Sequence, residues 1–346
     1  MKRFFLLIFT FVFLYSCQKE YQPRNIDSIS LQKFKIDTTS IRAIHAVDGN
    51  TLYYVGSKGD IGKTTDGGKT WNKQYVRYQD SIVPHFRSMA SNGSEMYALS
   101  VANPALLYRI NAGNPTIVYK EEHEKVFYDS MKFFDEKNGI AMGDPTEDCL
   151  SIILTHDGGN TWTKIPCDQL PKAAEGEAAF AASNTNIKVL GKTAWIVTGG
   201  AKARVFKTTD LGETWKVYET PIVQGGSSQG IYSVDFADKN NGFIIGGNYL
   251  KEDENKANKA ITTDGGKTWT LVAEGKYPNY KSCVQYVPNS NGKEVFAVGK
   301  TGVSYSNDGG HTWKEVSKEG YYIIQFANHN TAWLAGNRKI GKISLD

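Results

Sequence analysis

The sequence carries little excess charge, because its 40 lysines and arginines nearly balance its 36 aspartates and glutamates. The formal charge is +4 over 346 residues and would fall to +2 if Lys2 and Arg3 were removed with an N-terminal signal. A near-neutral surface gives no electrostatic basis for binding nucleic acid. Two redox motifs are also missing: no Gly-x-Gly-x-x-Gly follows a strand, and there is no Cys-x-x-Cys-His haem site.

The N-terminal apolar run, Phe4 to Leu14, is short. A membrane-spanning helix needs about 20 residues, so this run, which follows two basic residues, predicts an export signal. The Leu-Tyr-Ser-Cys sequence that ends at Cys17 resembles a lipobox, in which Cys17 would be lipidated and become the first mature residue. Ordinary secretion with cleavage nearby is the alternative.

These features divide the chain into three segments. Residues 1–16 are expected to be a lipoprotein signal peptide, 17–29 the lipidated cysteine with a polar tether, and 30–346 the folded domain. We expect a monomer in the cell envelope, at the periplasmic or the surface face of the outer membrane, with its lipid as the only membrane contact.

Cysteine is rare, and three residues would remain after processing: Cys149, Cys167 and Cys283. Pairing across the hairpin around Asp157 would place Cys149 nearly opposite Cys167. Opposed antiparallel residues have Cα atoms about 4.5 to 5.5 Å apart, which a disulfide accepts. An oxidising envelope favours this disulfide, and two reduced thiols on one sheet are the alternative. Cys283 is expected to be a buried small hydrophobe.

Metal-ligand patterns are weak. The six histidines are scattered without the spacing of a metal site. Asp144, Glu147 and Asp148 offer oxygen ligands for calcium, as do Glu252 to Glu254, but neither group matches a twelve-residue EF-hand loop. We therefore predict no metal site and no cofactor, with calcium as the one weakly supported possibility.

The most informative positive feature is a repeat, Asp-x-Gly-x-Thr-Trp. Successive aspartates are separated by 91, 53, 54 and 44 residues, and the first interval splits into 45 and 46 if Asn111-Ala112-Gly113 is a degenerate sixth copy. Such a period is typical of propeller blades. The five copies are Asp66 to Trp71, Asp157 to Trp162, Asp210 to Trp215, Asp264 to Trp269 and Asp308 to Trp313.

Each copy lies between two strand-like runs, so it is expected to be a hairpin turn. The aspartate can accept backbone N–H bonds within the turn, and the glycine allows a positive φ. Tryptophan then resumes the strand and needs one partner for its indole N–H. The pattern resembles the BNR or Asp-box repeat of sialidases, sortilin-like receptors and photosystem II stability/assembly factor-like proteins. That resemblance implies a structural role for the box, on the face opposite an active site.

The predicted fold class is all-β, a seven-bladed β-propeller of four-stranded antiparallel blades closed by an N-terminal strand. The last unit stops after Lys339 to Leu345, before any fourth strand, so Ser30 to Ile36 is expected to supply its outer strand and close the ring. The blades are expected to begin near Ile41, Phe86, Phe127, Ala178, Gly230, Lys281 and Tyr321. Six or eight blades are the alternatives.

Function is expected on the face opposite the boxes, where the blade-to-blade connections and the loops between second and third strands lie. Candidate ligand-binding residues are those that the repeat does not require. They are His85, Arg87, Tyr128, Asp129, Asp144, Arg204 and Tyr232.

Glu175 and Glu177 are the candidate catalytic residues, because two carboxylates near a channel mouth could act as acid and base on a glycoside. A solvated polar loop is the alternative interpretation. The sialidase resemblance implies three arginines for the substrate carboxylate, a tyrosine nucleophile assisted by a glutamate, and an aspartate that acts as the acid. The Arg-Ile-Pro signature of that family is missing, and His85 to Met89 resembles it only faintly.

The sequence thus predicts an envelope-anchored propeller lipoprotein that binds or assembles with an envelope protein or a glycan. A glycoside hydrolase, sialidase-like or other, is the second hypothesis. A cofactor-dependent oxidoreductase on a propeller scaffold is a distant third, which rests on fold analogy alone.

Overall fold

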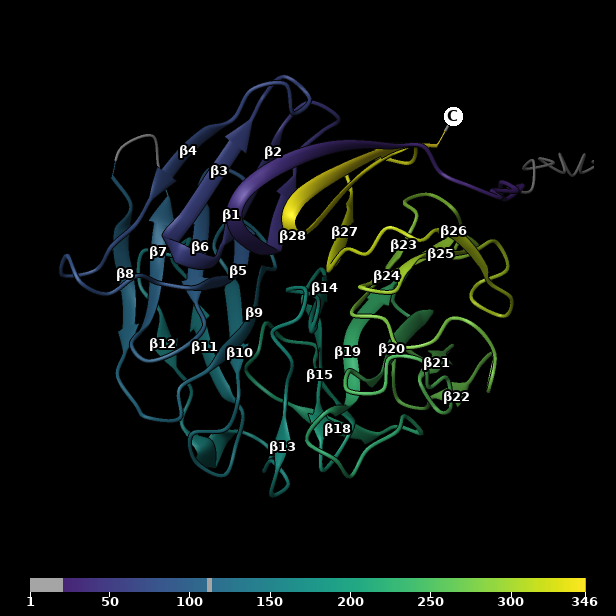
Figure 1. The fold of residues 1–346 in the computed structure, drawn as a ribbon. Coiled ribbons are helices and arrows are strands. Elements are labelled where there is room, and N and C mark those ends of the chain that lie inside the picture. Colours follow the sequence, from purple (N-terminus) through teal and green to yellow (C-terminus); the bar gives the residue numbers. More distant parts are fainter. Residues whose placement is uncertain (1–20, 111–113, 346) are drawn as a thin grey trace, which may run out of the picture.

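Short antiparallel strands surround a central channel in the computed structural model, which describes residues 21–110 and 114–345 (Figure 1). The predicted lipidation residue Cys17, the signal peptide and the degenerate box Asn111-Ala112-Gly113 lie outside the described residues. The described residues include two 3-10 turns, η1 (Ser57–Gly59) and η2 (Cys167–Gln169). No helix in the described ranges is long and apolar enough to cross a membrane. The predicted all-β propeller class is confirmed.

The described strands form six hydrogen-bonded sheets. The sheet that contains both chain ends has the order β27 (Ile323–Phe326), β28 (Thr331–Ser344), β1 (Leu31–Ala46), β2 (Leu52–Gly56), β3 (Asp60–Thr64) and β4 (Asn72–Tyr75). The next two sheets are β5 (Phe86–Ser91), β6 (Met96–Ser100), β7 (Ala105–Ile110) and β8 (Thr116–Glu121), and β9 (Tyr128–Phe133), β10 (Gly139–Gly143), β11 (Ser151–Thr155) and β12 (Thr163–Lys164).

The remaining three sheets complete the ring. One contains β14 (Ile187–Leu190), β15 (Thr193–Val197), β17 (Arg204–Thr208) and β18 (Lys216–Glu219). The second six-stranded sheet has the order β13 (Glu177–Ala178), β16 (Gly199–Gly200), β19 (Gln229–Phe236), β20 (Gly242–Asn248), β21 (Lys259–Thr262) and β22 (Thr270–Leu271). The last contains β23 (Cys283–Tyr286), β24 (Val295–Gly299), β25 (Gly302–Ser306) and β26 (Lys314–Ser317).

The predicted number of seven separate four-stranded blades is wrong, because the strands form six sheets, two of which have six strands. The physical reason is the continuity of β1. Its first part, Leu31 to Ser40, pairs with β28, and its second part, Ile41 to Ala46, pairs with β2. The units expected to begin at Ile41 and at Tyr321 are therefore joined by backbone hydrogen bonds into one sheet.

Closure by an N-terminal strand is confirmed. Leu31 pairs with Ile343 and Lys35 with Lys339, so the beginning and the end of the chain share one antiparallel ladder (Figure 1). Arg24, which precedes β1 in the sequence, adds side-chain hydrogen bonds to this ladder. Its Nε donates to Glu294 at 2.9 Å, and its Nη1 donates to the Leu345 carbonyl at 3.0 Å. The two ends of the chain therefore stabilise each other.

The boxes are self-contained turns. In the first, the Asp66 carboxylate accepts the Thr70 backbone N–H at 3.0 Å and the Thr70 hydroxyl at 2.5 Å. The Trp71 indole donates to the Gly68 carbonyl at 3.1 Å. The other four boxes repeat all three bonds. A Cβ at Gly68 would meet the Phe34 ring at 2.5 Å, so this glycine also allows the turn to pack on its neighbour.

The hydrophobic core lies between neighbouring sheets. Between the β5–β8 and β9–β12 sheets, for example, Tyr97, Leu107, Met131 and Trp162 pack together, all at most 7% exposed. Because each sheet covers the face of the next, the ring buries apolar side chains on both faces of its sheets.

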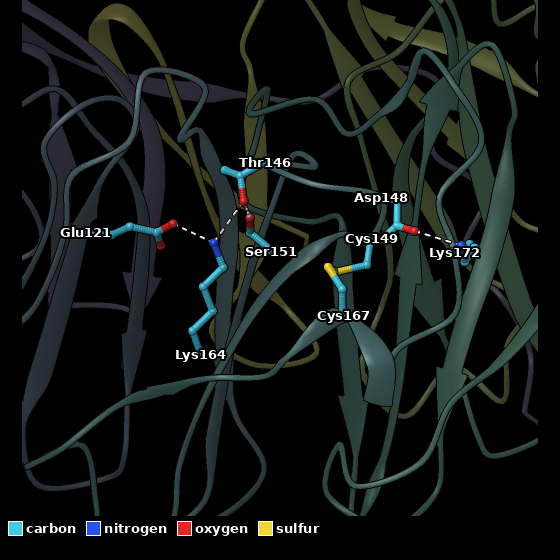
Figure 2. Close-up of a disulfide and its surroundings, with 8 residues drawn as sticks. All are labelled: Glu121, Thr146, Asp148, Cys149, Ser151, Lys164, Cys167 and Lys172. Atoms are coloured by element: carbon cyan, nitrogen blue, oxygen red, sulfur yellow. Dashed lines mark hydrogen bonds and ion pairs between the residues drawn. A yellow bond between two sulfur atoms is a disulfide. The ribbon is translucent and has the colours of Figure 1, made fainter.

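Cys149 and Cys167 form a disulfide with Cα atoms 5.5 Å apart (Figure 2). The bond joins the loop after β10 to η2, and the adjacent Asp148 carboxylate binds the Lys172 ammonium at 2.9 Å. Together they hold the chain that leads to Glu175 and Glu177 against the β9–β12 sheet. Cys283 is fully buried, in agreement with its expected role.

Replacing both Cys149 and Cys167 by serine should lower the free energy of unfolding by about 3 kcal/mol, because the bond closes a loop of 18 residues in the unfolded chain. Chemical denaturation of the variant and the wild type, each with and without reductant, would measure this. The variant itself serves as the control, since reductant should not change it. Equal stability of the oxidised wild type and the variant would contradict the prediction.

Candidate functional site

The inner strands begin at the face opposite the boxes, where side chains from several sheets surround one end of the channel. We call this cluster the channel mouth. It consists of Arg42, Arg87, Asp129, Phe180, Tyr232, Tyr280 and Tyr322, which come from β1, β5, β9, β19 and three connecting segments.

A segment that sequence reasoning did not identify occupies the channel axis. We call Ala181–Asn186 the central segment. The Asn184 side chain donates to the Met89 carbonyl at 2.7 Å and accepts the Met131 N–H at 3.0 Å, while Ser183 donates to the Ser282 carbonyl at 2.7 Å. Because these contacts reach β5, β9 and the start of β23, the segment must lie between inner strands from different sheets.

The central segment also restrains two arginines. Arg42 donates to the Ala182 carbonyl at 3.0 Å, and Arg87 donates to the Ala181 carbonyl at 3.1 Å. The Arg42 guanidinium stacks 4.0 Å above the ring of Tyr322. Burial, followed by repulsion from Arg87, lowers the pKa of Arg42. Each guanidinium has five N–H donors, and among the described residues one N–H group of each donates to a protein acceptor.

Asp129 is fully buried, and neither of its carboxyl oxygens has a hydrogen-bond partner within the described structure. Burial, together with the nearby Asp144 carboxyl, raises the pKa of Asp129 well above its usual range, against the opposing effect of Arg87. Burial also raises the pKa of Asp144 to about 6, although Asp144 accepts the Ala179 N–H at 2.7 Å. A raised pKa favours the neutral form of the Asp129 carboxyl, which weakens its charge interaction with Arg87.

Aromatic rings form one side of the channel mouth. Phe180 and Tyr232 stack with their centroids 3.9 Å apart, and Tyr280 meets Tyr232 edge-on at 4.9 Å. Tyr249 extends this cluster outward, 6.4 Å from Tyr232, and its neighbour Leu250 is 71% exposed. The channel mouth thus combines the packed aromatic rings with the two cations Arg42 and Arg87. The exposed side chains of Tyr249 and Leu250 beside them form what we call the apolar rim.

The two candidate catalytic carboxylates have different surroundings. Glu177 is buried, and its carboxylate binds the Arg204 guanidinium through both oxygens, with further bonds from the Thr198 hydroxyl at 2.6 Å and the Ala174 N–H at 2.8 Å. Glu175 is exposed. Both line a surface pocket of 630 Å³ beside Asp144, but Glu177 has its acceptor sites occupied. The ion pair between Glu177 and Arg204 therefore joins β13 to β17 and has a structural role.

The remaining predicted ligand residues are dispersed. His85 is exposed on the connection before β5. Tyr128 is fully buried, and its hydroxyl donates to Glu121 at 2.7 Å, away from the mouth. Arg87, Asp129 and Tyr232 lie at the mouth, and Asp144 lies close to Asp129. Within residues 21–110 and 114–345, no group of three acidic, histidine or cysteine side chains is arranged to hold a metal ion.

Comparisons with known proteins support the repeat and the fold. Residues 260–271 match the BNR/Asp-box repeat family model. The structure titled "YCF48 bound to D1 peptide" matches with a TM-score of 0.66 at 15% identity, over 93% of this chain and 100% of that one. YCF48 from Cyanidioschyzon merolae gives 0.64 at 16%, over 91% and 98% of the two chains.

The WD40 repeats of RRP9 match equally well, with a TM-score of 0.66 at 12% identity over 94% of this chain and 100% of that one. No curated protein matches the sequence. The resemblance to Asp-box propellers of the photosystem II assembly factor type is confirmed for the repeat and the fold. At such low identities these likenesses establish the fold and leave function to be argued from the site.

Replacing Glu177 by glutamine should destabilise the protein by about 3 to 5 kcal/mol, because it leaves the Arg204 guanidinium mostly buried without its counter-charge. The exposed neighbour provides the matched control: Glu175→Gln should stay within about 0.5 kcal/mol of wild type. Denaturant unfolding would measure both. Equal stability of the two variants would rule out the structural role of the Glu177–Arg204 pair.

Proposed function

We propose that this propeller is a binding module that holds an acidic segment of a protein partner at the channel mouth. The observation that carries the proposal is the position of Tyr249 and Leu250. They are two of five large hydrophobic side chains exposed in the described part of the chain, and they are adjacent in sequence. Exposed apolar side chains beside buried aromatic rings and arginines resemble the composition of protein interfaces.

The two arginines give the channel mouth a positive charge, which favours an anionic partner. Arg42 and Arg87 are close enough to repel each other, and both are held by neutral carbonyl groups of the central segment. A carboxylate would accept from both guanidinium groups and relieve their repulsion. Arginine forms bidentate pairs with carboxylates while its planar group stacks on an aromatic ring, as Arg42 stacks on Tyr322.

A related fold supports the choice of a peptide. A YCF48 structure is titled as bound to D1 peptide, so a propeller of this fold takes a peptide ligand in that case. The similarity is one of fold, so the inference for this chain depends on its own residues at the mouth. A glycan is the other partner class, and a glycan array distinguishes the two.

The proposal places the protein in the cell envelope, anchored by a lipid on Cys17. The support is the sequence alone: a short basic and apolar segment ends in Leu-Tyr-Ser-Cys, which resembles a lipobox. An assembly or binding module held at a membrane would meet partners there at a raised effective concentration.

Peptides selected from a random display library on the full chain should be acidic, and Leu250→Asp should weaken their binding at least tenfold, or by about 1.4 kcal/mol. The matched control is Val47→Asp, which changes an exposed hydrophobic residue on the box face and should leave affinity unchanged. Fluorescence anisotropy at rising salt would measure both, and affinity should fall as salt screens the arginines. Equal binding by Leu250→Asp, or selective retention on a glycan array instead, would contradict the proposal.

Replacing Cys17 by alanine should move the protein from the membrane to the soluble envelope fraction and abolish incorporation of labelled palmitate. Cys283→Ala is the control, since a buried thiol is not a lipid acceptor. Cell fractionation with fatty-acid labelling would measure both variants. Palmitate labelling that survives Cys17→Ala would refute the lipid anchor.

A further inference from the structure

A second feature of the channel lies at the other end from the mouth. The inner strands run from the mouth toward the box face, and residues of β1, β9, β14, β19, β23 and β27 line a cavity of 220 Å³. Four of the polar side chains that line it are Lys132, Lys188, Gln285 and Gln325, from β9, β14, β23 and β27. Thr185, near the end of the central segment, also lines it, whereas Ala181 and Ala182 at its beginning bind the arginines of the mouth.

The orientation of the two glutamine amides is determined by backbone bonds. Gln285 Oε1 accepts the Phe326 N–H and Gln325 Oε1 accepts the Ala46 N–H, both at 2.9 Å. The opposite end of each amide is therefore an NH₂ group. Neither NH₂ group donates to a protein acceptor in the described ranges, so the cavity wall presents hydrogen-bond donors.

Lys132 lacks an acceptor as well. The nearby Asp235 carboxylate binds other groups, because one oxygen binds the Lys188 ammonium at 2.5 Å and the other accepts the Tyr286 N–H at 2.7 Å. No hydrogen bond or ion pair from Lys132 to another residue occurs in the described structure. Lys132, Lys188 and Asp235 together carry a net charge of +1.

The other titratable groups near Lys132 cannot supply the missing negative charge. Burial, followed by repulsion from Lys132, lowers the pKa of His45 to about 4, so this imidazole is neutral. Burial raises the pKa of the Cys283 thiol to about 11. Burial, together with Lys188, lowers the pKa of Lys132 itself to about 8. An uncompensated ammonium in such a site is unfavourable unless an anion enters.

We infer that this cavity binds one small oxygen anion, a carboxylate or a tetrahedral oxyanion, between the Lys132 ammonium and the amide NH₂ groups of Gln285 and Gln325. A charge-assisted bond from the ammonium and neutral bonds from the amides match an anion of single negative charge. The site lies below the central segment, so it is separate from the channel mouth and independent of the function proposed for it.

Calorimetric titration of the full chain with sodium acetate, sulfate and phosphate, each at constant chloride concentration, tests the inference. At least one of these anions should bind at a single saturable site. Lys132→Met should weaken that binding at least tenfold, and Lys239→Met, at an exposed lysine on the box face, should leave it within twofold. Binding of acetate alone would identify a carboxylate site, and binding of sulfate or phosphate a tetrahedral one.

Gln285→Glu provides a second variant that does not depend on how Lys132→Met folds. The new carboxylate can still accept the Phe326 N–H, and it places a permanent anion beside Lys132. This variant should unfold at a higher temperature than wild type without added anion and should bind none. No saturable binding by wild type, or wild-type affinity in either Lys132→Met or Gln285→Glu, would overturn the inference.

Discussion

The hydrogen bonds along the inner edges of the sheets are the constraint on which the rest of the structure depends. A sheet edge has backbone N–H and C=O groups that need partners, and in a propeller every inner strand turns such an edge toward the channel. Here side chains from neighbouring strands supply the partners: Gln325 for Ala46, Gln285 for Phe326, Asp235 for Tyr286 and Ser233 for Val284. Three of these bonds cross a sheet boundary, and the bond from Ala46 to Gln325 joins β1 and β27, two strands of one sheet that do not pair directly.

The central segment provides further hydrogen-bond partners for the inner edges of β5, β9 and β19. Asn184 satisfies one backbone group of β5 and one of β9, and the Thr185 carbonyl accepts the Val234 N–H of β19 at 3.0 Å. The side chains of the central segment are uncharged, so the segment fills the channel without neutralising the charged side chains around it. Its carbonyl groups therefore hold the arginines of the mouth without neutralising them, and it adds no counter-charge near Lys132.

Part of the fold and of the candidate site could be predicted from the sequence. The boxes are local turns whose hydrogen bonds stay within six residues, and closure by the N-terminal strand follows from a last unit that lacks a strand, so both were predictable. The sheet count was not, because alternation marks strand-forming residues but does not show that β1 runs on from one ladder into the next. The central segment has the composition of an ordinary loop, and its role depends on partners about 50 to 140 residues away. Glu177 and Arg204 were expected near the functional face, but their pairing required the fold.

Both proposed anion sites depend on the distribution of charge along the channel, although the composition of the protein is nearly neutral. Its surface acids and bases are intermixed and screened by solvent, whereas Arg42, Arg87, Lys132 and Lys188 lie along one axis with low-dielectric walls. Among the acids on that axis, burial raises the pKa of Asp129 and so favours its neutral form, and Asp235 binds Lys188. Field lines concentrate in such a channel, and this is the physical basis of the two proposed anion sites. The size of the anion differs between them, because the mouth opens beside an exposed apolar rim and the lower cavity is small.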